Sequence, residues 1–478
     1  MATLEKDLPG EKPLQPSSGD EEAPAHINEK ALVRRLDRTL LPALTFLYLL
    51  SFLDRSNVGN ARVEGLATDL HMTGDQYLTG LTLYFIGYVL FEVPANMVLK
   101  IWTPRAWLPT LTLVWGIVST LMGVIQSRTG FFIVRFFLGV AEAGLFPGIV
   151  FYLSMWYKRN ERQFRVALFF SAASLAGAFG GILAWGIAHM KGVGGYNGWR
   201  WIFILEGLLT VIVSAVSYLF IHNYPNTAKF LSDDERLFVQ NRLKEDSDAT
   251  ADEKFNMRNV KKAFTDIKVY LYALAYHTMS LPLYTLSLFL PTIISSLGYT
   301  AAQAQLMTIP PYAIAFFLTV GVAILSERYQ RRAPFILVTS SLAILGYILL
   351  LSDPRPGVSY LGTILAAAGI YPSVALVLSW PANNVSGQTK RAIANAIQIS
   401  IGNCGAVIGT QLYRTESSPR FFLGHSFALG YLVANLLVTT TLWWVLKREN
   451  ERRQAIPVSE QGEGPWLGDE DPRWRFHL

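Results

Sequence analysis

Twelve uncharged or nearly uncharged stretches, each long enough to cross a lipid bilayer as a helix, follow one another along the chain. A helix needs about 20 residues to span the hydrocarbon layer. The stretches lie at roughly 39–60, 77–99, 106–126, 131–153, 166–189, 200–221, 269–294, 303–325, 334–352, 359–381, 393–413 and 426–446. They are continuous runs, whereas membrane-spanning strands alternate over about ten residues. We therefore expect an all-α membrane protein with twelve transmembrane helices.

Polar segments divide the chain into two six-helix halves joined by a linker. The expected parts are a disordered tail (1–36), a first six-helix bundle (37–221), a linker (222–268), a second six-helix bundle (269–447) and a second tail (448–478). Within the linker, Ser232 and Glu235 have the spacing of a capping box, which predicts the start of a short amphipathic helix. No cleavable signal peptide is expected.

Positive charge is distributed as membrane orientation requires. The net charge is +6, but Lys and Arg lie in short loops between apolar stretches, so we expect no nucleic-acid partner. Their bias places both termini in the cytoplasm. The sequon at Asn384 then falls on the inner side, where glycosylation does not occur. The single cysteine, Cys404, excludes a disulfide within the chain. The plasma membrane is expected, with the vacuolar membrane as the alternative.

Small residues recur at matching places in the two halves. Ala173, Gly177 and Gly181 in the fifth stretch correspond to Gly405 and Gly409 in the eleventh, at four-residue spacing. Small residues let helix backbones approach closely, and tight packing alone is the simpler interpretation. Two halves with matching close contacts are also typical of carriers that work by alternating access.

Two adjacent charges, Asp54 and Arg55, stand where the first apolar stretch has not yet reached spanning length. A charge at the membrane centre costs about 2.5–3.5 kcal/mol on insertion scales, while each Leu or Phe returns about 0.3–0.6 kcal/mol. Such a pair needs polar partners or a water-filled cavity. The alternative is a snorkelling pair near the outer interface.

Arg135 and Glu142 are seven residues apart in the fourth stretch, so they project from one face of a helix. A shared face indicates a shared cavity, with a structural buried salt bridge as the alternative. A buried carboxylate whose proton affinity changes as a nearby Arg moves suits proton coupling. Asp54 and Glu142 are the carboxylates so placed.

Other buried polar residues have more than one interpretation. Glu206 lies near Arg200, which favours a structural pair, and Glu92 suits an inner gate. His277 is expected to pack rather than relay protons. Cavity positions are assigned to four aromatic residues, although helix packing accounts for each singly. These are Tyr84, Tyr88, Tyr284 and Trp380.

Six segments together carry a family resemblance: "FLDRSNVGNA", "YFIGYVLFEVPANMVLK", "RFFLGVAEAGLFPG", "GWRWIFILEG", "LYTLSLFLPTII" and "SWPANNVSGQTKRAIANAIQISIGNCGAVIG". Over about 30–450 the chain resembles the major facilitator superfamily, and within it the anion:cation symporters of the fungal allantoate permease branch. The resemblance implies proton coupling by Asp54 and Glu142 and anion binding by Arg55 and Arg135. Trp380, Asn383, Asn384 and Asn403 fit the branch's pattern in the second half, which implies a binding role.

The loops after the second and eighth stretches echo one another as "LKIWTPRAW" and "SERYQRRAPF". Gating or structural roles are assigned to their charges, together with Glu92 and Glu206. These loop residues are Lys100, Arg105, Glu327, Arg328 and Arg332. The first loop departs from the superfamily's usual Gly- and Asp-rich pattern, so the family's gating details do not transfer.

We interpret the chain as a monomeric proton-coupled importer of a small organic anion, such as a carboxylate vitamin or nitrogen compound. It requires no metal or cofactor and is not expected to be an enzyme, because no Ser and His pairing at membrane depth is evident. An exporter of a secondary metabolite and a transport-inactive nutrient sensor are the alternatives. A sensor is disfavoured by tails of about 36 and 30 residues, which are too short for a signalling domain.

Overall fold

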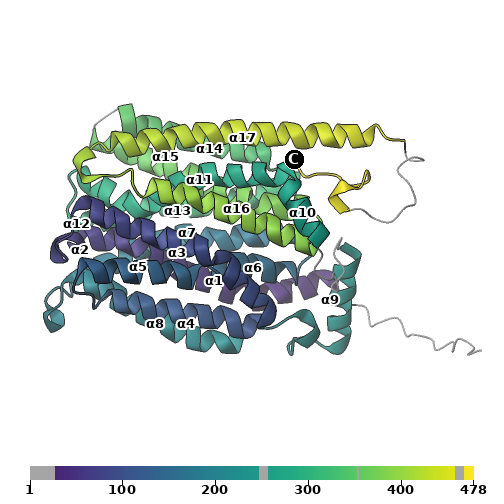
Figure 1. Ribbon diagram of the computed structural model, residues 1–478, viewed down its shortest axis with the longest axis horizontal. Helices are drawn as coiled ribbons and strands as arrows, with labels where there is room; N and C mark the ends of the chain where they lie inside the picture. The colour runs from purple at the N-terminus through teal and green to yellow at the C-terminus, as the bar shows by residue number, and fades with distance from the viewer. Residues whose placement is uncertain (1–26, 247–256, 353–354, 458–467) are drawn as a thin grey trace, which may run out of the picture.

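The computed structural model describes residues 27–246, 257–352, 355–457 and 468–478, and no strand occurs among them (Figure 1). In the first half the helices are α1 (Glu29–Val63), α2 (Leu66–Asp69), α3 (Gly74–Ile101), α4 (Pro104–Met122), α5 (Arg128–Glu142), α6 (Leu145–Ser154), α7 (Arg159–Ala188) and α8 (Gly198–Phe220). The linker contains α9 (Asp233–Asp246) and α10 (Met257–Thr265). The second half contains α11 (Ile267–Ser296), α12 (Ala301–Leu306), α13 (Ile309–Tyr329), α14 (Ala333–Ser352), α15 (Pro356–Asn384), α16 (Gln388–Gly409) and α17 (Phe422–Gln454).

The twelve expected crossings correspond to these helices. Over the described residues, 11 helical segments are long and apolar enough to span a membrane, and α5 with α6 and α12 with α13 each count as one. The 19-residue helix α4, which packs along α8, is the twelfth. The prediction of an all-α membrane fold is therefore confirmed.

The helices form two bundles that meet along a central seam. Across the seam, α1 packs against α11, α3 against α16, and α7 against both α13 and α15. Burial follows from these contacts, because 89% of the apolar window of α11 is buried but only 28% of that of α17. Helix α11 is thus central and α17 peripheral.

Helix α1 explains the two charges at the end of the first apolar stretch. It runs for 35 residues, so Asp54 and Arg55 lie inside the helix and not beyond it. It begins at Glu29, within the segment expected to be a disordered tail, because Asn28 caps it by accepting a hydrogen bond from the Ala31 N–H at 3.2 Å. Both charges are buried, Asp54 fully and Arg55 to 4% exposure.

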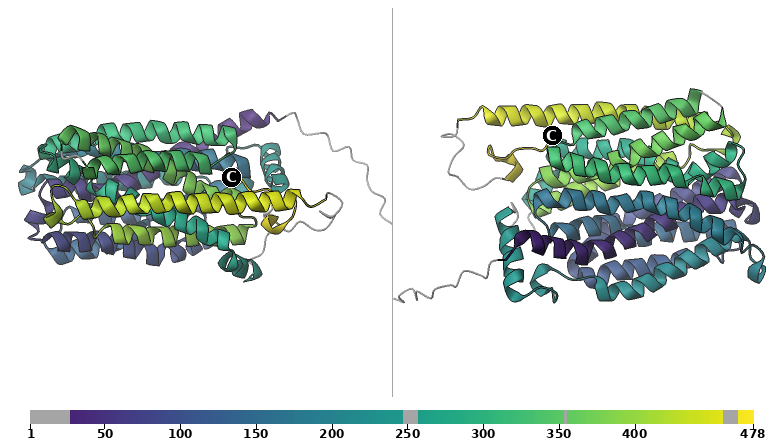
Figure 2. Two further views of the ribbon diagram at one scale, coloured as in Figure 1. Left: turned by 90° about the horizontal axis from the view of Figure 1, so that it is seen from above. Right: turned by 180° about the vertical axis from the view of Figure 1, so that it is seen from behind.

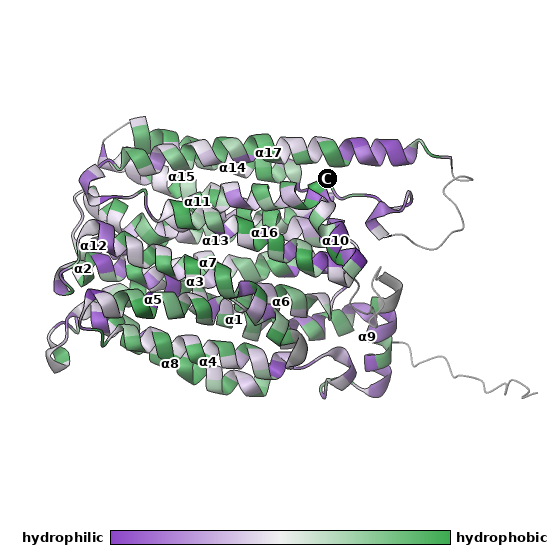
Figure 3. Ribbon diagram, in the orientation of Figure 1, coloured by the Kyte–Doolittle hydropathy of each residue, from purple (hydrophilic) through white to green (hydrophobic). Residues whose placement is uncertain are grey.

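The two ends of the bundle differ. One end, called here the terminal end, carries α9, α10 and the segment 468–478, and the opposite far end carries α2 and α12 (Figure 1). Figure 2 shows that α17 projects beyond the other long helices at the terminal end and that α9 lies across the bundle axis. Figure 3 shows hydrophobic residues along the long helices and hydrophilic ones on α9 and the end of α17.

Helix α9 is fastened to the first half by ion pairs. Arg242 bonds Glu161 at 2.8 Å, and Arg35 of α1 bonds Glu235 at 2.8 Å. The capping box predicted at Ser232 and Glu235 is present, with the Glu235 N–H donating to Ser232 Oγ at 3.2 Å and the Ser232 N–H to Glu235 Oε2 at 2.9 Å. The first part of the linker therefore belongs structurally to the first half.

Segment 468–478 packs onto the terminal end of the second half, although the sequence predicted only a tail there. Its Trp474 and Phe476 are buried, and the backbone of His477 exchanges hydrogen bonds with the Asn384 side chain at 2.8 and 2.9 Å. The guanidinium of Arg453 donates to the carbonyls of Asp469, Asp471 and Trp474 at 2.9–3.2 Å.

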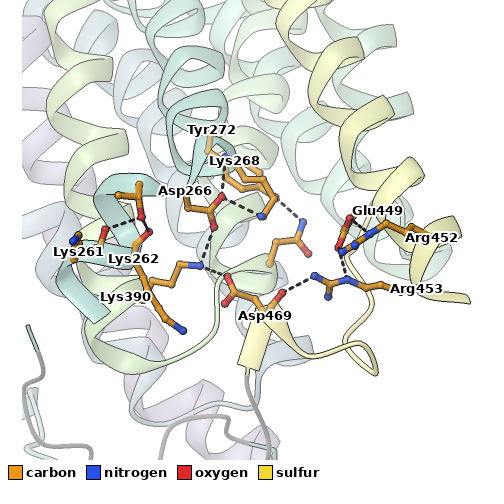
Figure 4. Close-up of polar contacts among 12 residues, drawn as sticks. Lys261, Lys262, Asp266, Lys268, Tyr272, Lys390, Glu449, Arg452, Arg453 and Asp469 are labelled. Carbon is orange, nitrogen blue, oxygen red and sulfur yellow. Dashed lines mark hydrogen bonds and ion pairs between the residues drawn. The ribbon is translucent and has the colours of Figure 1, made fainter. Parts of the chain in front are cut away.

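An ionic cluster joins this segment to the helix ends beneath it (Figure 4). Lys390 at the start of α16 contacts Asp266 at 2.8 Å and Asp469 at 2.6 Å. Asp266 also caps α11 by accepting from the Lys268 N–H at 3.0 Å. Burial acts to raise the pKa of Asp266, but the positive charges of Lys268 and Lys390 outweigh it and lower that pKa.

The seam is closed at the far end by direct backbone contact. A Cβ at Gly59 of α1 would lie 2.4 Å from the Leu288 carbonyl oxygen of α11, so only glycine fits. Hydrogen bonds join the halves nearby, from Arg62 to Thr415 at 3.2 Å and between the hydroxyls of Thr82 and Thr410 at 2.8 Å.

Candidate functional site

A small cavity lies in the seam near the middle of the bundle. Four of its lining residues belong to the first half and five to the second. They are Tyr48, Arg55, Tyr88 and Phe146, and Tyr276, Tyr284, Leu378, Ile399 and Asn403. Arg55 is the charged residue among them, so any anion that enters this central cavity meets one guanidinium in an aromatic surrounding.

The guanidinium of Arg55 contacts both halves of the protein. Its Nη2 and Nε donate to Oε2 of Glu142 at 3.0 and 3.3 Å. Its Nη1 donates to the hydroxyl of Tyr284, on α11, at 2.9 Å. A single side chain of α1 therefore links a carboxylate of the first half to a phenol of the second.

Aromatic rings surround this guanidinium. The centroids of Tyr88, Tyr84, Tyr284 and Phe52 lie 5.3, 5.4, 5.5 and 5.8 Å from Cζ of Arg55. Ring faces attract a cation more strongly when water is excluded. The rings therefore stabilise the charge of Arg55 in addition to its ion pair with Glu142.

Glu142 is paired with Arg55, and the Arg135–Glu142 salt bridge that was the alternative interpretation is not formed. It is buried to 1% exposure and also accepts a hydrogen bond from the Tyr84 hydroxyl, while its Oε1 has no partner. Arg135 is also buried and lies 5.2 Å from the Tyr84 ring centroid, with Nε and Nη1 unpaired. Tyr84 therefore stands between the two arginines.

Asp54 is adjacent to Arg55 in sequence but faces a different part of the first half. Its carboxylate accepts hydrogen bonds from Trp115 Nε1 at 3.0 Å, Ser119 Oγ at 2.9 Å and Thr210 Oγ1 at 3.1 Å. These donors come from α4 and α8. The two candidate proton-coupling carboxylates thus occupy separate surroundings, and Glu142 is the one that contacts a residue lining the central cavity.

A larger cavity of about 810 Å³ lies in the seam toward the terminal end. Phe146 lines the central cavity and its chain neighbour Pro147 lines this one, so the two cavities border adjacent residues of α6. Arg162 of α7 and Arg391 of α16 contribute to its lining, as do Asn96 and Asn395. This terminal cavity therefore has a mostly apolar lining that includes two arginines.

Some of the other residues selected from the sequence line the central cavity, and others do not. Asn403, Tyr88 and Tyr284 line it, whereas Trp380 donates its indole N–H to the His477 carbonyl at 2.9 Å and is absent from the lining. His277 contacts the Ile401 carbonyl at 2.9 Å, in agreement with a packing role.

The residues assigned to gating are dispersed. Glu92 is buried in α3, where its Oε2 accepts from Ser400 of α16 at 3.4 Å, so this contact crosses the seam. Arg105 instead bonds the Tyr218 carbonyl at 3.0 Å within the first half. The side chain of Lys100 lies outside the described residues.

The remaining gating candidates stand at the end of α13 and in the turn that follows it. Glu327 and the exposed Arg328 end α13. Arg332 is buried, and its backbone N–H donates to the Leu478 carbonyl. Glu206 accepts from Asn57 at 2.5 Å, whereas its expected neighbour Arg200 pairs with Asp69 at 3.2 Å.

Sequence reasoning missed five of the lining residues. Tyr48, Phe146, Tyr276, Leu378 and Ile399 all line the central cavity. Tyr48 stands seven residues before Arg55 on the same helix face, and Tyr276 eight residues before Tyr284, so helical spacing from the chosen residues was an available signal.

Comparison with known proteins agrees with this architecture. The sequence profile of the Major Facilitator Superfamily matches residues 44–410. The "MFS-type transporter cnsO" of Penicillium expansum is 36% identical over 471 residues, which cover 94% of this chain and 91% of that protein. The "High-affinity nicotinic acid transporter" of Saccharomyces cerevisiae is 32% identical over 482 residues, covering 98% and 89%.

Solved structures share the fold at low sequence identity. The proton:xylose symporter XylE superposes with a TM-score of 0.65 at 15% identity, covering 85% of this chain and 96% of its own. A bacterial homolog of the lysosomal transporter Spinster, in an inward-facing and occupied conformation, gives a TM-score of 0.63 at 15% identity, covering 88% and 98%. These similarities concern the fold alone.

Proposed function

This chain belongs to the Major Facilitator Superfamily, and from that premise we propose that it carries a small organic anion through the membrane together with a proton. Its relatives are transporters and not enzymes. The observation that carries the proposal is the buried pair of Arg55 and Glu142 at the cavity between the two halves.

Coupling follows from competition between two carboxylates for one guanidinium. While Glu142 is ionised, it occupies two of the N–H groups of Arg55, and an incoming carboxylate meets a neutralised cation. When Glu142 takes up a proton, it no longer requires Arg55, and the guanidinium is free to bind the substrate carboxylate through two parallel hydrogen bonds. In this scheme the anion binds only when Glu142 is protonated, so each anion is accompanied by a proton.

The lining supports a small, flat anion as substrate. Tyr48, Tyr88, Tyr276 and Phe146 line the cavity together with Arg55, so the lining is largely aromatic. The similarity to a high-affinity nicotinic acid transporter points in the same direction, toward an aromatic or heteroaromatic carboxylate. Asn403, whose Oδ1 is buried without a partner, is a candidate to accept a hydrogen bond from a ring N–H or hydroxyl.

Movement follows the alternating-access scheme of the superfamily. Backbone contact at Gly59 and Leu288 joins the halves at the far end, while the larger terminal cavity lies on the terminal side of the central one. With the terminal end in the cytoplasm, as the charge bias favours, this is a state from which substrate is released inward. Import is the direction we propose, and the membrane is the plasma membrane.

Glu142→Gln tests the coupling. The neutral amide resembles the protonated acid, so we expect exchange of internal for external labelled nicotinate to survive in reconstituted vesicles. Net uptake should lose its stimulation by acidic external pH. Asp75→Asn, which removes an exposed carboxylate of α3, is the matched control and should behave as the parent.

Three results would count against the proposal in different ways. Full acid-stimulated accumulation by Glu142→Gln would show that Glu142 does not couple. Transport of no member of a panel of labelled carboxylates by the parent would remove the anion class. Outward transport of the same anions, driven by a proton gradient of the opposite sense, would favour the exporter.

A further inference from the structure

Besides Asp54, Glu92 and Glu142, the first half contains a further buried carboxyl group, Glu206. It is 2% exposed, and among the described residues no Lys or Arg forms an ion pair or hydrogen bond with it or with Asp54. Helix α8 packs against α1, α4 and α7, and the charged group of those helices that acts on Glu206 is Asp54, also an acid. Two ionised carboxylates in one buried, cation-free pocket are strongly unfavourable.

Hydrogen bonding indicates which of the two acids holds a proton. Asp54 accepts three hydrogen bonds, from Trp115, Ser119 and Thr210, which satisfy an ionised carboxylate. Glu206 accepts one, from Asn57, at 2.5 Å. The asymmetry favours ionised Asp54 and protonated Glu206.

The atoms left over agree with that assignment. Oδ1 of Asn57 and Oε1 of Glu206 are both buried without a partner, and both are acceptors if Glu206 is ionised. When an amide N–H donates to one carboxyl oxygen in a coplanar arrangement, the two remaining oxygens face each other. A proton on Oε1 would supply the donor that Oδ1 of Asn57 lacks.

The opposite orientation of the Asn57 amide leads to the same conclusion. In that case two oxygens would face each other at 2.5 Å, a separation typical of O–H···O hydrogen bonds and requiring a proton between them. Both orientations of the amide therefore favour a neutral Glu206.

We propose that Glu206 is a neutral carboxylic acid that holds a resident proton in a paired acid–amide contact with Asn57. It is a positioning residue, because Asn57 lies two residues after Arg55 on α1, so the pair fixes that helix to α8. This proton is distinct from the one that Glu142 exchanges, and its presence does not depend on the proposed coupling.

Infrared spectroscopy of the full chain in lipid vesicles tests the proposal without transport. The spectrum at neutral pH should contain a carbonyl band of protonated carboxylic acid that Glu206→Gln lacks. Asn57→Ser should shift that same band, because it removes the amide that bonds the acid. Identical spectra for the parent and Glu206→Gln, or a band that Asn57→Ser leaves unmoved, would overturn the proposal.

Uptake of labelled nicotinate, at equal abundance in the membrane, gives the second test. Glu206→Gln should retain most of the parent's uptake and its pH profile, since the amide supplies an N–H toward Oδ1 of Asn57, whereas Glu206→Ala should lose uptake. Equal loss in both variants would mean that the negative charge is needed. Dependence of parental uptake on Na⁺ at constant pH, abolished in Glu206→Gln, would assign the site to a metal cation instead.

Discussion

Among single side chains, Arg55 combines the properties that anion recognition requires. It is buried, it is ringed by aromatic faces, and its hydrogen bonds are divided between Glu142 in its own half and Tyr284 in the other. Removing one partner of a buried ion pair costs about 3–5 kcal/mol, so exchanging Glu142 for a substrate carboxylate is easier than leaving Arg55 unpaired. In the coupling that we propose, this requirement makes binding of the substrate depend on protonation of Glu142.

Lysine substitutions separate the two candidate arginines. Arg55→Lys keeps the charge but loses the paired N–H groups, and because charge-assisted hydrogen bonds contribute about 1.5–3 kcal/mol, we expect substrate affinity to fall roughly tenfold or more. Arg135→Lys should have a smaller effect, since Arg135 contacts the Tyr84 ring and forms no hydrogen bond among the described residues. Concentration dependence of labelled uptake measures both. A larger loss at Arg135 would make it the carboxylate clamp.

The sequence predicted which charges are buried but not how they pair. Asp54, Arg55, Arg135 and Glu142 interrupt apolar stretches, and insertion costs alone imply cavities or partners for them. Pairing depends on how α1 packs against distant helices, which periodicity within one helix does not encode. In the structure Glu142 pairs with Arg55, and the Asp54 carboxylate accepts hydrogen bonds from Trp115 and Thr210.

Among the helices, the crossing of α1 and α11 controls how the far end closes. The contact is between backbones at Gly59 and Leu288, with no large side chain between them. Such a crossing separates and re-forms without rotamer changes.

Gly59→Ala should hold the far end open. The added methyl would lie 2.4 Å from the Leu288 carbonyl oxygen, so the helices must separate. We expect net uptake to fall sharply. In a Cys404→Ser background, a cysteine replacing the buried Thr410 should become reactive toward a membrane-impermeant thiol reagent.

Gly186→Ala is the matched control, because a methyl group at that position of α7 meets nothing within 4 Å. It should leave both uptake and thiol reactivity unchanged. Unaltered reactivity in Gly59→Ala would show that closure of the far end does not depend on this crossing.

The ionic cluster at the start of α11 makes stability depend on pH. Asp266→Asn keeps the helix cap but removes the charge that faces Lys268 and Lys390, so we expect a loss of about 1–3 kcal/mol at neutral pH. The pKa of Asp266 is lowered in the folded protein, so its contribution is present above the ordinary value of 3.8 and is lost as pH falls through the folded pKa. Thermal unfolding of the parent and the variant should therefore converge in acid, and a constant difference would contradict the assignment.

The sequence predicted the long apolar helices but not the residues at which they begin and end. The break between α5 and α6 at Ala143 and Gly144 falls inside one apolar run, and the early start of α1 depends on a single cap at Asn28. Segment 468–478 has no periodicity, and its position is set by contacts with Arg453 and Asn384, which are distant in sequence.

Over the whole molecule, the two halves act as bodies that share one seam. Helix α9 is attached to the first half and segment 468–478 to the second, so each half carries its own polar segment at the terminal end. The halves can therefore rock against each other without breaking the contacts that hold α9 and segment 468–478.

We propose from the charge bias that the terminal end lies in the cytoplasm, and epitope insertion tests this orientation. An epitope after Gly298, in the turn that follows α11 at the far end, should be recognised by antibody on intact cells. An epitope after Thr227, between α8 and α9, should be recognised only after permeabilisation. The reverse pattern would exchange the inner and outer gates.

The terminal cavity has a pharmacological consequence. In the inward-facing state that we propose, a planar acid extended by a bulky group on the side away from its carboxylate should reach Arg55 while the extension remains among the residues that line the terminal cavity. Such a molecule should inhibit transport, because its extension prevents the two halves from closing at the terminal end. Its inhibition of uptake would not be relieved by raising the substrate concentration outside, since the two ligands occupy opposite states of one carrier.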